Sequence, residues 1–151
     1  MHISWNFLDK RKATIKAIEA FHSMGFILEN TDNEIATVRS RMVGAGSPRF
    51  DGMPRSHNNN AAEERMVKGI AEIDMLKERY RQAVEYMSWF KPAWEQLSED
   101  ERFTLESFYM DVDEGDANRM VQEELNISQS GAYNKKNQAL DHLSLLLYGK
   151  A

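Results

Sequence analysis

An apolar repeat running through residues 66–97 constrains the fold of this chain more than any other feature. Its best-defined members follow one another at alternating spacings of three and four: Ile73, Leu76, Tyr80, Ala83, Met87, Phe90, Trp94 and Leu97. Such a repeat places a narrow apolar stripe along one amphipathic α-helix, as in a helical hairpin or a coiled coil. Pro92 lies inside the repeat. Because proline removes a backbone donor and disfavours helical geometry at the preceding residue, we expect the helix to kink or restart there.

The chain before the repeat is also predicted to be helical, with one long loop at residues 43–60, where glycine, proline and asparagine are frequent. A first helix should have an apolar face and end near Gly25 and the sequence ENTDNE; this face contains Leu8, Ile15, Ile18 and His22. Thr31 and Glu34 form a capping-box pattern that would open a second helix. The stripe then packs against an N-terminal helix or, alternatively, forms the interface of a homodimer.

The last third of the chain indicates three helices joined by short connections. Ser98 opens the first, with Glu101 completing a capping box. A short helix is expected from Ala117 to Leu125, and after a turn Ser128 should cap a third helix from Gln129 to about Leu147. This order of helix, loop, helix, tight turn and helix is typical of tri-helical DNA-binding domains.

These patterns predict an all-α protein, because no β-strand pattern of any length appears. Residues 1–97 would form a helical N-terminal part, a hairpin or coiled-coil-like structure, and residues 98–151 a trihelical helix-turn-helix domain. Cysteine is absent, which excludes disulfide scaffolds and thiol nucleophiles and suits a reducing cytosol. The sequence shows neither a signal peptide nor an apolar run long enough for a bilayer. We therefore expect a cytoplasmic protein with no membrane partner.

Several short segments of the last third match a known pattern. They are Glu101, Arg102 and Leu105, the dipeptide EG at 114–115, NIS at 126–128 and QAL at 138–140. In these residues the chain resembles region four of sigma factors, the helix-turn-helix that reads promoter DNA. Its architecture is most similar to the small sigma-region-four-like regulators of Gram-positive phages, the ArpU type. The resemblance implies a phage transcriptional regulator that binds double-stranded DNA together with RNA polymerase.

The helix after Ser128 is expected to contact DNA with its polar side chains. The candidate DNA-binding residues are Ser128, Gln129, Ser130, Tyr133, Asn134, Lys135, Lys136 and Asn137. Of these, Lys135 and Lys136 should meet phosphates, and the polar residues of the helix should face the groove. Ala132, Ala139, Leu140 and Leu143 should belong to the core.

The charge distribution limits how this helix can bind. The chain carries a formal net charge of −5, and from Ser98 onward it has 5 basic and 11 acidic residues, a net −6. Phosphate neutralisation dominates protein–DNA affinity. However, the only acid between Gln129 and Lys150 is Asp141, so the helix is locally positive. A second basic set flanks the loop: Arg39, Arg41, Arg49 and Arg55. We expect such a module to act as a dimer or held by a partner such as RNA polymerase.

Two other functions are compatible with the sequence. Acidic residues from Glu99 to Asp116 favour a protein-interaction module, for example an anti-repressor or polymerase inhibitor, that binds a basic partner. The aromatic residues Trp89, Phe90 and Trp94 belong to the core or, alternatively, form a stacking platform for single strands.

No enzyme, metal site or cofactor is expected. The sequence DVDEGD at 111–116 resembles the start of an EF-hand loop, but its glycine stands one position early. Gln122 occupies the position of the bidentate glutamate. The four histidines fall on separate predicted elements and suggest neither a catalytic triad nor a metal cage.

Overall fold

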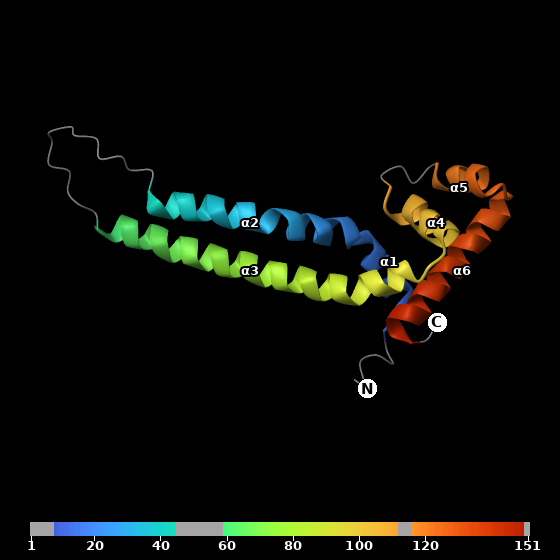
Figure 1. Cartoon of the computed structure of the whole chain (residues 1–151), viewed down its shortest axis with the longest axis horizontal. Helices are drawn as coiled ribbons and strands as arrows, with labels where there is room; N and C mark the ends of the chain where they lie inside the picture. The colour runs from blue at the N-terminus through green and yellow to red at the C-terminus, as the bar shows by residue number, and fades with distance from the viewer. Residues whose placement is uncertain (1–7, 45–58, 112–115, 150–151) are drawn as a thin grey trace. The chain divides into compact units, whose positions relative to one another are not determined.

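The computed structural model describes residues 8–44, 59–111 and 116–149. These ranges form helices and contain no β-strand, which confirms the all-α prediction (Figure 1). The helices are α1 (Lys10–Glu19), α2 (Phe21–Val43), α3 (Asn59–Glu95), α4 (Glu99–Tyr109), α5 (Ala117–Leu125) and α6 (Gln129–Tyr148).

The chain folds into two compact units. The first unit combines the chain up to Met24 with the chain from Glu85 onward, and the second consists of Gly25–Val84. This division differs from the boundary expected between residues 97 and 98. The difference arises because α1 and the end of α3 share a buried cluster with α4 and α6.

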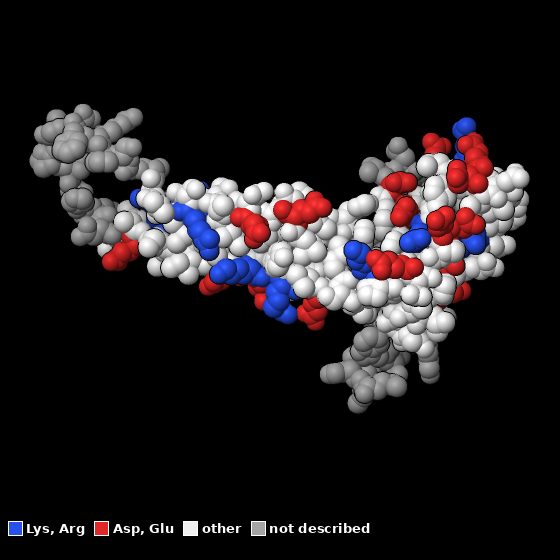
Figure 2. Space-filling view, in the orientation of Figure 1, with Lys and Arg blue, Asp and Glu red and all other residues white. Residues whose placement is uncertain are grey.

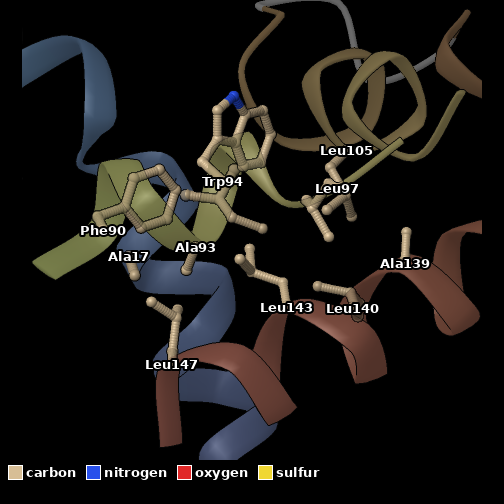
Figure 3. Close-up of a cluster of buried hydrophobic side chains, with 11 residues drawn as sticks. Ala17, Phe90, Ala93, Trp94, Leu97, Leu105, Ala139, Leu140, Leu143 and Leu147 are labelled. Atoms are coloured by element: carbon tan, nitrogen blue, oxygen red, sulfur yellow. The ribbon is translucent and has the colours of Figure 1, made fainter. Parts of the chain in front are cut away.

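A single apolar core holds the first unit together (Figure 3). Its buried residues come from α1, from the end of α3 and the residues after it, from α4 and from α6: Ala17, Ile18, Phe90, Ala93, Trp94, Leu97, Leu105, Ala139, Leu140, Leu143 and Leu147. Burying one large apolar side chain contributes about 1.5–3 kcal/mol. The C-terminal half of the apolar stripe supplies three of these large side chains, Phe90, Trp94 and Leu97, and is therefore part of this core.

Aromatic side chains fix the end of α3 against α1. The ring of Tyr86 stacks on that of Phe90, with centroids 5.2 Å apart. Its hydroxyl donates a hydrogen bond to the carbonyl oxygen of Ala17, and burial raises the pKa of Tyr86 well above its ordinary value. Trp89 lies 5.6 Å from the ring of Tyr148, so the end of α6 is held by the same stretch of α3.

Helix α3 continues through Pro92 to Glu95, so the expected restart at the proline is wrong. Proline removes only one backbone donor, whereas the residues around it are strongly buried. Phe90 is 0% exposed, and Ala93 and Trp94 are also buried. Packing of these side chains offsets the lost hydrogen bond.

The N-terminal helices also differ from the prediction. The interruption lies at Ala20, which ends α1, and α2 runs unbroken through Gly25 and ENTDNE. Thr31 does not cap a helix: it is buried inside α2, and its hydroxyl donates to the Ile27 carbonyl oxygen at 2.5 Å. One glycine inside a helix costs about 1 kcal/mol of stability. Burial of apolar side chains on the following turns of α2, such as Ile35 and Val38, contributes more than this.

In the second unit α2 and α3 lie side by side as a helical hairpin (Figure 1). Four buried side chains form its core, with Met42 packed against them: Ile35, Val38, Ile73 and Leu76. Glu34 of α2 accepts hydrogen bonds at 2.7 Å from the Arg79 guanidinium of α3. A Cβ at Gly69 would stand 2.2 Å from Met42 Cγ, so glycine permits this close approach. Of the expected loop at 43–60, residues 45–58 lie outside the described ranges, and Val43 and Asn60 are helical.

Candidate nucleic-acid interface

The connection between α5 and α6 is a tight turn built from local interactions. Asn126 takes the left-handed conformation with φ 53° and ψ 51°, which asparagine tolerates better than most residues. Ser128 Oγ then accepts a hydrogen bond from the Gly131 amide at 3.1 Å and caps α6. A Cβ at Gly131 would lie 3.2 Å from that oxygen, so glycine leaves room for the cap.

One side of α6 is packed into the first unit. Its first buried residue is Ala132, and Ala139, Leu140 and Leu143 follow on the same side, as the sequence predicted. Helices α4, α5 and α6 each contact the other two. Ala117 and Val121, the buried residues of α5, contribute to this packing. The opposite side of α6 therefore determines what the helix can bind.

The polar residues predicted to contact DNA divide into two groups. Five are exposed: Ser128, Gln129, Ser130, Tyr133 and Asn134. Three are half-buried: Lys135, Lys136 and Asn137. None of the eight is fully buried, so the N-terminal half of α6 presents a polar surface to solvent. Amide and hydroxyl groups there can hydrogen-bond base edges, and ammonium groups can bind phosphates.

Phe108 of α4 joins this surface, which the sequence did not indicate. Its ring centroid lies 6.1 Å from that of Tyr133 on α6. The Lys136 ammonium stands 5.2 Å from the Phe108 centroid and 5.3 Å from the Tyr133 centroid, within range of cation–π attraction. The two aromatic rings hold Lys136 near the exposed side of α6. No local pattern reveals this cluster, because the contact joins two helices.

Arg11 is a second residue at this surface that the sequence prediction omitted. Its guanidinium donates a hydrogen bond to Asn137 Oδ1. Arg11 belongs to the segment KRKATIK, whose basic character is visible in the sequence. Only the packing of α1 against α6 shows that this segment lies beside the candidate interface.

Within the described residues no carboxylate forms an ion pair with Lys135 or Lys136. The closest acid–base contact on the helix is between Glu101 Oε2 and His142 Nδ1, at 2.6 Å. In the second basic set, Arg41 is paired with Glu72 at 2.9 Å. The others are Arg39, which is exposed, and Arg49 and Arg55, which lie outside the described residues.

The exposed acidic residues of the C-terminal helices belong mainly to α4, α5 and their ends. Figure 2 shows Asp and Glu side chains predominating on the visible face of α4, α5 and α6. The exposed acids of these helices and their ends are Glu99, Asp100, Glu106, Asp111, Asp116, Glu123 and Glu124. Arg119 pairs with Glu123 at 3.0 Å, which leaves most of this surface negative. A basic partner would be attracted to it.

The structure also bears on the stacking platform, the EF-hand-like sequence and the membrane spans considered from the sequence. The stacking platform for single strands is wrong, because Phe90 and Trp94 are buried in the core. In the described ranges no three His, Asp or Glu side chains gather as metal ligands, and residues 112–115 of the EF-hand-like sequence lie outside those ranges. No described helix combines the length and hydropathy that a membrane span requires.

A comparison of the chain with protein-family models, curated proteins and solved structures finds no match. The physical properties of the surface are therefore the basis for a functional proposal. They combine exposed amide and hydroxyl groups, lysine ammonium groups that pair with no described carboxylate, and a helix whose inner side is packed.

Proposed function

We propose that this protein is a phage-type transcriptional regulator that binds double-stranded DNA through α6 and acts together with RNA polymerase. The observation that carries the proposal is the exposed polar surface at the start of α6, directly after the tight turn from α5. In helix-turn-helix proteins the second helix uses its N-terminal residues to contact base edges. Gln129, Ser130, Tyr133 and Asn134 occupy that position here and are all exposed.

The chemistry of these side chains favours particular contacts. Amides such as Gln129 and Asn134 pair with the N6 and N7 edge of adenine, whereas arginine, which pairs with guanine, is absent from α6. Lys135 and Lys136 supply sequence-independent contacts to phosphates. A protein with few such cations binds weakly alone, and RNA polymerase would raise its effective concentration on DNA.

Substitutions on α6 should separate affinity from sequence preference. We expect Lys135→Gln and Lys136→Gln to weaken binding to all duplexes alike and to lower the salt dependence by about one unit of slope each. Tyr133→Ala and Asn134→Ala should change which sequences are preferred. Selection from random duplexes, followed by titration of labelled duplexes at several salt concentrations, measures both effects.

The exposed Lys77 on α3 provides a matched control, since Lys77→Gln removes the same charge from the second unit. It should leave binding unchanged. Failure of the wild-type protein to bind any duplex, alone or with RNA polymerase, would defeat the proposal.

The negative surface of α4 and α5 favours a second candidate, a protein-interaction module that binds a basic partner as an anti-repressor or polymerase inhibitor. Capture of RNA polymerase or a repressor would distinguish the two candidates. Capture that resists nuclease and survives substitution of Lys135 and Lys136 supports the second candidate. Capture that requires DNA and both lysines supports the first.

A further inference from the structure

Helix α1 is the most basic helix among those described. It carries four cations, Lys10, Arg11, Lys12 and Lys16, and a single acid, Glu19. The sequence prediction assigned this helix to an N-terminal part separate from the DNA-binding domain. In the structure α1 belongs to the same compact unit as α6 and contacts both α4 and α6.

The core fixes where α1 lies on α6. Ala17 and Ile18 share one buried cluster with the inner residues of α6, namely Ala139, Leu140, Leu143 and Leu147, so α1 packs against the buried side of α6. The first turn of α1 lies beside the middle of α6, where Arg11 donates its hydrogen bond to Asn137. Arg11 therefore lies beside Asn137, the last of the candidate DNA-binding residues on α6.

Arg11 retains donors for a ligand. A guanidinium has five N–H donors, and the bond to Asn137 uses one of its nitrogens. The side chain is exposed, and no described carboxylate forms an ion pair with it. Arg11 also lies near Tyr109 at the end of α4. Burial raises the pKa of Tyr109, and the positive charge of Arg11 partly opposes that rise. An oriented guanidinium of this kind binds phosphate strongly, often through two parallel hydrogen bonds.

We propose that Arg11 is a contact to the DNA backbone, oriented by Asn137 so that its guanidinium binds a phosphate of the duplex that α6 enters. This inference rests on the proposed DNA-binding function. It makes α1 part of the DNA-binding surface and supplies positive charge that the three C-terminal helices lack. The N-terminal segment of the chain is then required for DNA binding and not only for folding.

The test uses the full chain and a short fluorescently labelled duplex of mixed sequence, because phosphate contacts do not depend on sequence. Arg11→Gln should weaken binding about tenfold at low salt, which is typical of losing one hydrogen-bonded charge contact. The slope of log affinity against log salt should fall by about one. Arg11→Lys keeps the charge and should keep most of the slope. Lys77→Gln is the matched control and should behave as wild type.

The same titrations separate failure of the inference from failure of the proposed function. If Arg11→Gln binds as wild type while Lys135→Gln and Lys136→Gln bind weakly, Arg11 is not a phosphate contact and α6 still binds DNA. If Arg11→Gln and Arg11→Lys both lose affinity with an unchanged slope, Arg11 only orients α6, and the inference is wrong. If the wild-type chain binds no duplex, with or without RNA polymerase, both are wrong. Thermal unfolding of each variant verifies that it is folded.

Discussion

Replacing Phe90 with alanine is expected to destabilise the first unit by about 3–5 kcal/mol, the usual range for truncating a buried aromatic side chain. Phe90 is 0% exposed, and its ring lies 5.6 Å from that of Phe21 and 5.5 Å from that of Trp94. Truncation leaves a cavity at the junction of α1, α3 and α6. Chemical denaturation followed by tryptophan fluorescence measures the loss, since Trp94 is buried in the same core.

Phe26→Ala is the matched control for this experiment. Phe26 lies on α2 and is 61% exposed, so removing the same ring there should change the free energy of unfolding by less than about 0.5 kcal/mol. Equal destabilisation by the two substitutions would contradict the core shown in Figure 3.

A fragment that begins at Ser98 is expected not to fold. It contains α4, α5 and α6 but lacks six buried residues of their core, of which four are large: Ile18, Phe90, Trp94 and Leu97. Each large buried side chain contributes about 1.5–3 kcal/mol, so the loss is similar to the entire 5–15 kcal/mol stability of a typical domain. Leu140 and Leu143 would be left exposed to water.

Circular dichroism and the dispersion of amide NMR signals test this expectation, with the full chain as reference. The fragment should show little helix and no cooperative unfolding transition. A native-like spectrum with a sharp transition would show that residues 98–151 form an independent domain, which is the boundary that the sequence predicted.

The C-terminal helices could be predicted because their ends are set by local chemistry. Ser98 Oγ accepts from the Glu101 amide at 3.2 Å, and Ser128 caps α6 in the same way. Asn126 makes the turn between α5 and α6 with its own left-handed backbone. Each of these interactions joins residues at most three positions apart, so their spacing in the sequence carries the information.

The division into two units and two residues of the candidate interface could not be predicted, because they depend on contacts between distant segments. The spacing of the apolar stripe is the same throughout, so it does not show where one unit ends. Ile73 nevertheless packs in the hairpin, and Phe90 packs in the core of the first unit. Phe108 and Arg11 reach the candidate interface only through packing on α6. Likewise, the buried side of α2 outweighs Gly25, although a glycine and a polar cluster usually interrupt a helix.

The central claim is that the exposed N-terminal half of α6 enters a DNA duplex. Its most direct test is amide and side-chain NMR of the nitrogen-labelled full chain during titration with a short duplex. We expect the largest shift changes at residues 128–137, with a smaller set at the first turn of α1. Changes confined to the acidic surface of α4 and α5, or no changes at saturating duplex, would contradict the claim.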